Sequence, residues 1–250
     1  VLVDFQDDIA ASGENQYTLK TATPRAMPKQ SITGKKTDAG IIVDTGPITF
    51  AISKDHPFSL FSQVTANGKP IAGGGRASYQ DAINDQTYLA GKPETIEVEY
   101  AGRMRITIKV SGDFEGDDQT KASYIARYTA WAGKSIVHVK YTISNSNPDH
   151  YTWRFVKDST IRLKLAESPQ ATLLGAAEPI EAGSNGWLAQ SLEPKVWKTI
   201  VKDAARAGEG DKRLWTGNGE SARGWIAARM GQRNVFVSDR YFMSDLPRRL

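Results

Sequence analysis

The sequence predicts an all-β protein, built as a large antiparallel β-sandwich with little helix. Three observations support this prediction. Several segments alternate apolar and polar residues with period two, as half-buried strands do. Turn signals rich in Gly, Asn and Pro separate these segments, and no motif repeats along the chain as it does in solenoids and propellers. With 250 residues and 40% hydrophobic content, the chain is long enough for one large all-β domain or two smaller ones.

The longest alternating stretch runs from Ile96 to Val110 and predicts one long strand with a single buried face. Gly102 interrupts its apolar row, which predicts a bulge or a close backbone contact at that point. The apolar row consists of Ile96, Val98, Tyr100, Met104, Ile106, Ile108 and Val110. The polar row consists of Glu97, Glu99, Arg103, Arg105, Thr107 and Lys109.

Three further strands are expected over residues 124–131, 135–145 and 160–165, with a hairpin link at Ala132-Gly133-Lys134. If they share one sheet with residues 96–110, their polar sides combine into a mostly basic face. We expect its central residues to lie on neighbouring strands, on the same side of the sheet: Arg103, Arg105, His138 and Lys140. An ordinary solvated sheet face is the alternative. The wider set adds Lys109, Arg162 and Lys164, with Glu97 and Glu99 at one end.

The remaining segments are shorter. Residues 1–36 contain two short strands and a linker rich in Thr, Lys and Gly, so we expect the end of an N-terminal β module there and the β-sandwich domain over residues 37–250. Two strands flank the turn at residues 45–47, another covers residues 58–64, and Asn67-Gly68 is a hairpin turn signal. Residues 196–207 are the one predicted helix, although a strand over residues 196–201 fits nearly as well. Strands over residues 224–228 and 234–237 close the chain.

Composition limits the function. The chain has no Cys, which excludes disulfides, thiolate metal sites and a Cys nucleophile. The net charge of +4 is dispersed, and the pI is about 9.1, which suits an anionic partner better than a nucleic acid. No apolar segment reaches the roughly 18 residues of a membrane helix. We expect no cofactor and no metal, although an acidic loop leaves calcium open without the spacing of a calcium-binding loop. Its residues are Asp113, Glu115, Asp117 and Asp118.

The turn-rich segment at residues 145–152 carries His150 and Tyr151, and Trp153 and Arg154 follow it. Loops concentrate functional residues. Basic groups pair with the carboxylates of uronates, and exposed tryptophan rings stack on sugar faces. Because tryptophan is usually core, we expect four or more of the six tryptophans to be buried.

Four segments, in order, resemble segments of the exo-rhamnogalacturonan lyase and YetA-like proteins: VLVDFQDDIAASGENQYTL, DTGPITFAISKDHPFSLFSQVTANGKPI, YIARYTAWAGKSIVHVKYTISN and GWIAARMGQRNVFVSDRYFMSDLP. The resemblance implies an N-terminal barrel, a central supersandwich-like domain as in polysaccharide lyases and a C-terminal helical toroid. This chain would hold the sandwich and little else, as part of a longer chain. Tyr141 stands where the family tends to have His, and His138 where it tends to have Arg. Met243 and Leu246 replace its Trp and Phe.

We therefore expect the β-sandwich portion of a carbohydrate-active protein, a polysaccharide lyase acting on acidic, pectin-like glycans. The alternative is a non-catalytic carbohydrate-binding or structural module, so whether the chain is an enzyme stays open. Its partners would be an acidic glycan and further domains of the parent chain, and this substrate class favours the periplasm or the extracellular space. β-Elimination requires a base and a cation that neutralises the uronate. The catalytic candidates are His138, His150 and Tyr151, and the substrate-binding candidates are Arg103, Arg105, Lys140, Trp153 and Arg154.

Overall fold

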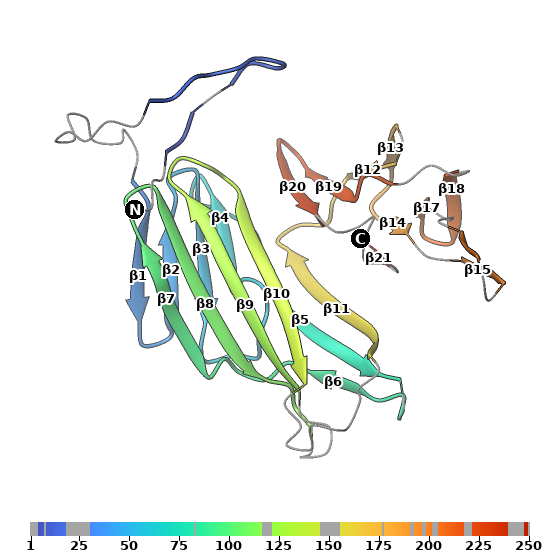
Figure 1. The fold of residues 1–250 in the computed structure, drawn as a ribbon, viewed down its shortest axis with the longest axis horizontal. Coiled ribbons are helices and arrows are strands. Elements are labelled where there is room, and N and C mark those ends of the chain that lie inside the picture. Colours follow the sequence, from blue (N-terminus) through green and yellow to red (C-terminus); the bar gives the residue numbers. More distant parts are fainter. Residues whose placement is uncertain are drawn as a thin grey trace. The chain divides into compact units, whose positions relative to one another are not determined.

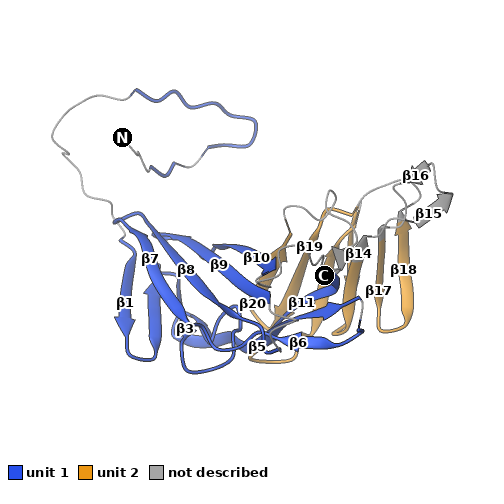
Figure 2. Cartoon of the chain, turned by 60° about the horizontal axis from the view of Figure 1, so that its bottom comes forward, with its two compact units in different colours: residues 1–164 blue, residues 165–250 orange. Residues whose placement is uncertain are grey.

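The computed structural model describes residues 5–7, 9–18, 31–82, 84–116, 122–145, 156–176, 178–190, 193–196, 199–201, 205–217, 222–239 and 248–249. All of its regular elements in these ranges are strands, arranged in antiparallel sheets (Figure 1), so the all-β prediction is confirmed. The chain divides into two compact units, residues 1–164 and residues 165–250 (Figure 2). The predicted domain boundary between residues 36 and 37 stays a prediction. None of the described residues form a helix long and apolar enough to cross a membrane.

The first sheet of the first unit has seven strands in the order β1-β2-β3-β4-β5-β11, with β6 also paired to β5. Asn67 and Gly68 both have positive φ angles, 50° and 73°, as the tight turn between β4 and β5 requires. The bounds are β1 (Thr33–Thr37), β2 (Gly40–Asp44), β3 (Ile48–Ser53), β4 (Gln63–Ala66), β5 (Lys69–Asp81), β6 (Thr87–Leu89) and β11 (Val156–Leu165).

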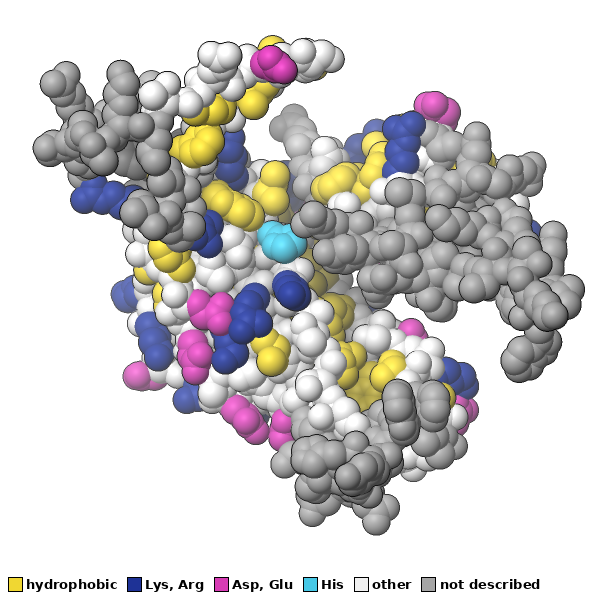
Figure 3. Space-filling model, in the orientation of Figure 1, with side chains coloured by type: hydrophobic (Ala, Val, Ile, Leu, Met, Phe, Trp, Pro, Cys, Tyr) yellow, Lys and Arg dark blue, Asp and Glu magenta, His cyan; other side chains and the backbone are white. Residues whose placement is uncertain are grey.

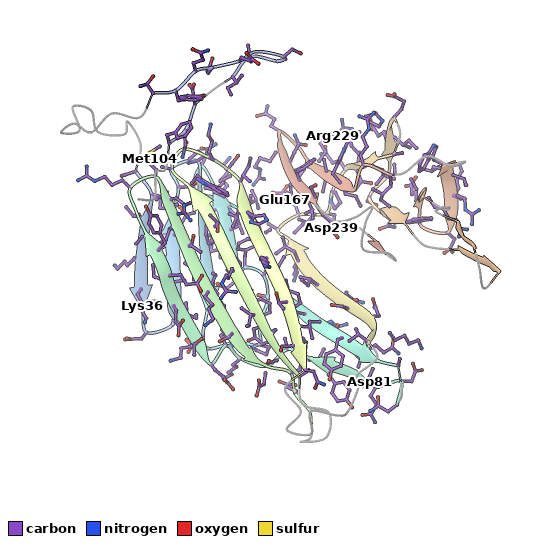
Figure 4. All side chains as sticks on the ribbon, viewed as in Figure 1. Lys36, Asp81, Met104, Glu167, Arg229 and Asp239 are labelled. Carbon is purple, nitrogen blue, oxygen red and sulfur yellow. The ribbon has the colours of Figure 1, made fainter. Side chains whose placement is uncertain are left out.

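The second sheet follows the order β10-β9-β8-β7, with antiparallel neighbours throughout. Its strands are β7 (Thr95–Ala101), β8 (Arg105–Asp113), β9 (Ala122–Trp131) and β10 (Val137–Asn145). The predicted single strand over residues 96–110 is therefore wrong, because it is a hairpin. The amide of Gly102 donates to the carbonyl of Arg105 at 2.9 Å and closes the turn, where Met104 lies (Figure 4). Arg103 belongs to this turn and not to a strand.

Strand β11 does not lie where we expected residues 160–165, which was in the same sheet as residues 96–110. Its alternation holds, since Ile161 and Leu163 are half-buried and Arg162 is exposed. However, β11 pairs with β5 in the seven-stranded sheet and not with the four-stranded one. Gly75 has a φ angle of 116°, and a Cβ there would lie 1.9 Å from the carbonyl oxygen of Arg162. Alternation predicts which side chains face inward, but it does not say which strand is the neighbour.

The two sheets of the first unit enclose an aromatic core. Phe58, which precedes β4, packs its ring 4.5 Å from the ring of Tyr124 on β9 and stacks on Tyr141 of β10 at 5.9 Å. Phe61 meets Tyr128 edge to face at 5.7 Å. Fully buried aliphatic side chains fill the space between these rings, among them Ile41, Val43, Ile108 and Val110.

The second unit contains two four-stranded sheets and a two-stranded one, in the orders β13-β12-β19-β20, β18-β17-β14-β21 and β15-β16. Its core is a cluster around Leu174, Leu188 and Ala207. The helix predicted over residues 196–207 is wrong, because the described residues there form strands. The bounds are β12 (Ala171–Gly175), β13 (Pro179–Ala182), β14 (Gly186–Gln190), β15 (Glu193–Val196), β16 (Thr199–Val201), β17 (Ala205–Glu209), β18 (Lys212–Gly217), β19 (Trp225–Met230), β20 (Arg233–Ser238) and β21 (Arg248–Arg249).

Candidate functional site

The outer face of the sheet β7–β10 is built of rows of side chains that cross its strands. Residues paired across antiparallel strands lie on the same side of the sheet, and the residues between them in sequence are buried, such as Ile108 and Tyr128. Acidic and basic side chains are interleaved over this sheet (Figure 3). One row is Glu97, Lys109, Arg127 and Lys140, and the next is Tyr100, Thr107, Thr129 and His138.

The charges toward β7 are neutralised within the sheet. The Nε of Arg127 donates to both carboxylate oxygens of Glu99 at 3.0 Å, and Lys109 lies 3.5 Å from Glu97. The guanidinium of Arg105 lies 4.3 Å from the centre of the Tyr100 ring, a cation–π geometry. Both carboxylates on β7 are thus engaged with cations of β8 and β9.

The basic side chains on β10 are not neutralised in the way that those near β7 are. His138 and Lys140 are exposed on β10, which is an edge of this sheet, and neither forms an ion pair with any described residue. The outward positions of β9 and β10 carry no carboxylate along their described lengths. Across the strand pair, Thr129 faces His138 and Arg127 faces Lys140. We call the following set the β9–β10 face: Arg127, Thr129, Trp131, His138, Lys140 and Thr142.

Three of the predicted site residues lie on the same side of one sheet, in three different rows. Arg105, His138 and Lys140 share one side of one sheet, as predicted. The expectation of neighbouring strands is wrong, because β9 lies between β8 and β10. Arg103 is exposed in the turn between β7 and β8, and its carbonyl accepts a hydrogen bond from the Ile32 amide. The roles of these residues stay predictions. Four further predicted site residues lie outside the described residues: His150, Tyr151, Trp153 and Arg154.

Sequence reasoning missed three residues of this surface. Arg127 could have been found from the alternation within residues 124–131, and the same phase places Trp131 opposite Arg105 on the outer side. Tyr100 was expected in the apolar row. A bulge between Val98 and Tyr100 shifts the register, so Tyr100 pairs with Thr107 and turns outward.

The tryptophan prediction is also wrong. All four tryptophans that the structure describes are half-buried, so four buried tryptophans are impossible: Trp131, Trp187, Trp215 and Trp225. Two of them, Trp131 and Trp225, take outward positions on their sheets. Both residues are therefore partly exposed on the outer side of a sheet.

Nothing in the described part of the chain indicates a metal site. Asp113 ends β8 and Glu115 follows, while Asp117 and Asp118 of the acidic loop lie outside the described residues. Among the described residues, no three acidic, His or Cys side chains lie close enough together to hold a metal ion.

Three tyrosines on the inner side of the sheet stay protonated at pH values at which an exposed tyrosine ionises. Burial raises the pKa of Tyr128 well above its usual range, and burial likewise raises the pKa of Tyr124 and of Tyr141. The Tyr124 hydroxyl donates to the Gly91 carbonyl at 3.1 Å, whereas those of Tyr128 and Tyr141 are buried and have no hydrogen-bond partner among the described residues. Tyr141, at the position where the resembled family tends to have His, therefore belongs to the core.

Two sheets packed around a shared aromatic core define the first unit as an antiparallel β-sandwich. A family model, described as the PcRGLX-like protein central beta sandwich domain, matches residues 32–158, just over half of the chain. The chain belongs to this family, a rhamnogalacturonan lyase-related one, and the predicted resemblance is confirmed. The match begins next to β1 and includes the whole four-stranded sheet. A search of curated proteins gave no match.

Proposed function

We propose that this chain binds acidic, uronate-containing oligosaccharides on the β9–β10 face, as the β-sandwich domain of a lyase-like protein. The observation that carries the proposal is the uneven neutralisation of charge across the sheet. The carboxylates of β7 engage Lys109 and Arg127, while Lys140 and His138 project from the β10 edge, where Lys140 faces the ion-paired Arg127 and His138 faces Thr129. An anionic ligand would neutralise the positive charge on β10 that no described carboxylate of this sheet balances.

The side chains of the β9–β10 face match the groups of a uronate. Lys140 can pair with a carboxylate, and Thr129 and Thr142 can exchange hydrogen bonds with ring hydroxyls. Trp131, half-buried at the end of β9, offers a ring to the apolar C–H side of a sugar. Because His138 and Lys140 are two residues apart on one strand, their Cα atoms are about 7 Å apart. An extended oligosaccharide could contact both.

Turnover is a second candidate function, favoured by the lyase-related family and by the place of His138 beside Lys140 on one face. In a β-elimination, a cation neutralises the uronate carboxylate and a base removes the proton on the adjacent carbon. Lys140 would supply the charge and His138 the base. Roles for His150 and Tyr151 stay predictions, and a module that binds without turnover remains the alternative.

Calorimetric titration of the chain with oligogalacturonate tests binding. We expect binding that weakens as salt is raised, because the contacts are exposed charges, and a loss of affinity of about tenfold in the double variant His138→Ala/Lys140→Ala. Lys109→Ala is the matched control, since Lys109 is already paired with Glu97, and should retain most of the affinity. Equal losses in both variants, or no binding by the wild type, would reject the proposal.

The same samples separate the two candidate functions. Ultraviolet absorbance of unsaturated uronate, followed over time, reports elimination. Product formed by the wild type and lost in His138→Ala, with binding retained, would support His138 as the base. Binding without product would support the non-catalytic module.

A further inference from the structure

The second unit carries an exposed aromatic pair. Trp225 on β19 and Phe236 on the adjacent edge strand β20 have ring centroids 5.6 Å apart and planes inclined by 31°. Phe236 is 61% exposed, the largest exposure of any large apolar side chain described in this unit. Both residues lie outside the segment that matches the family model.

Strand register shows that the two rings occupy the outer side of their sheet. Leu174 pairs with Ile226, and these side chains belong to the core of the unit. Leu173, Ala227 and Phe236 form the next row and point the opposite way. Trp225, two residues before Ala227, lies on the same side as Phe236. The rings are therefore turned away from the core.

Gly175 allows the Trp225 indole to lie flat on the sheet. A Cβ at this glycine would come within 2.7 Å of three ring atoms of Trp225. Any other residue here would push the ring away from the strand. With one side of the indole against Gly175, its opposite side and the Phe236 ring form a shallow aromatic surface, which we call the aromatic platform.

The surroundings of the platform are polar but neutralised. Asn234 and Ser238 are exposed on β20, on the same side as Phe236. Arg229, in β19 (Figure 4), donates to Glu181 at 2.9 Å, so its charge is satisfied. The aromatic platform thus has an apolar centre, with the amide of Asn234 and the hydroxyl of Ser238 along β20 and an ion-paired arginine on β19.

We propose that the aromatic platform binds a neutral pyranose, whose C–H side stacks on Trp225 and Phe236 while its hydroxyls reach Asn234 and Ser238. Exposed aromatic surface of this kind marks an interaction site. A protein partner, including a second copy, fits less well. Stable protein interfaces bury about 1,200–2,000 Å², whereas this apolar patch consists of two rings and the half-buried Leu173, with polar groups around them.

Nuclear magnetic resonance titration of the full chain, read on the Trp side-chain N–H signals, tests the platform. The probes are three neutral hexasaccharides, built of β-1,4-linked glucose, galactose and mannose, with hexagalacturonate for comparison. We expect at least one neutral probe to bind with little dependence on salt, and Phe236→Ala to weaken that binding fivefold or more. Gly175→Ala should also weaken it, because the new Cβ displaces the indole.

Val237→Ala is the matched control. Val237 is 45% exposed and next to Phe236 in β20, but it pairs with Ile226 and so lies on the opposite side. It should bind like the wild type. The proposal is overturned if no neutral probe binds, if Phe236→Ala binds as the wild type does, or if Phe236→Ala abolishes a dimer seen by analytical ultracentrifugation. The result does not depend on the β9–β10 face, because Lys140→Ala should leave neutral-probe binding unchanged.

Discussion

The two sides of the sheet β7–β10 are built from the same four strands and are held together by different physics. The inner side is determined by burial: Tyr124, Tyr128 and Val110 are fully enclosed. The outer side is determined by charge pairing, which is complete at Glu97 and Glu99 and is not continued at Lys140. The inner side therefore specifies the fold, whereas the outer side can take up a ligand where charge pairing ends.

The largest effect is expected from a cavity on the inner side. Phe58→Ala removes a buried ring that contacts Tyr124 and Tyr141, and we expect it to lower the free energy of unfolding by about 3–5 kcal/mol. Lys140→Ala on the outer side should change it by less than about 0.5 kcal/mol. Urea denaturation measures both. Similar changes in the free energy of unfolding for the two variants would show that the inner side does not determine stability more than the outer side.

Alkaline pH should also act through the inner side. Burial raises the pKa of Tyr124, Tyr128 and Tyr141, whereas tyrosines of the unfolded chain ionise near pH ~10. The unfolded state therefore loses protons first, and stability, intact below that pH, falls as the pH rises above it. Each tyrosine contributes a loss of about 1.4 kcal/mol at one pH unit above the unfolded pKa. Urea midpoints should fall less steeply with pH in Tyr128→Phe, and an unchanged slope would contradict the assignment.

Two substitutions on β9 compare buried hydroxyls directly. Tyr128→Phe removes a hydroxyl that has no hydrogen-bond partner in the described part of the chain, and should raise the free energy of unfolding by about 1 kcal/mol. Tyr124→Phe removes the hydrogen bond to Gly91 and should lower it by about 1 kcal/mol. Thermal or urea unfolding gives both values. A loss of stability in Tyr128→Phe equal to that in Tyr124→Phe would show that the Tyr128 hydroxyl has a partner.

The smallest effect is expected on the outer side. Glu99→Gln releases Arg127 from its carboxylate and extends the unpaired basic surface from β10 to β9. Affinity for oligogalacturonate should rise about twofold, the size of an exposed ion pair. Calorimetry at low salt measures it, with Glu181→Gln in the second unit as control. A lower affinity in Glu99→Gln would mean that the paired geometry of Arg127 is what the ligand requires.

Alternation was sufficient to predict the inner side and not the outer one. Ile106, Ile108 and Val110 were placed correctly, because burial enforces period two. The turn at Gly102 was missed because Met104 stays in phase with the apolar row, so a hairpin and a long strand have the same pattern. The bulge between Val98 and Tyr100 was also missed, because the sequence pattern does not show it. The pairing of Arg127 with Glu99 joins residues 28 positions apart and depends on strand order.

The second unit was predicted less well, because its structure also depends on which strands pair. Residues 196–207 contain good helix formers such as Arg206 and Ala207, but the pairing of these two residues with β18 overrides their local propensity. Trp225 and Phe236 both fall within strands that the sequence predicts. Their stacking, and the role of Gly175 beneath the indole, require the register of three strands.

The location of a bound acidic oligosaccharide on the sheet decides whether the β9–β10 face is the binding site. Backbone amide chemical shifts of the labelled chain, recorded during titration with hexagalacturonate, report it residue by residue. We predict that the largest changes lie in β9 and β10, around Arg127, His138 and Lys140, and that they disappear in Lys140→Glu. Changes centred on Glu97 and Glu99 of β7, or none in this sheet, would show that the β9–β10 face is not the binding site.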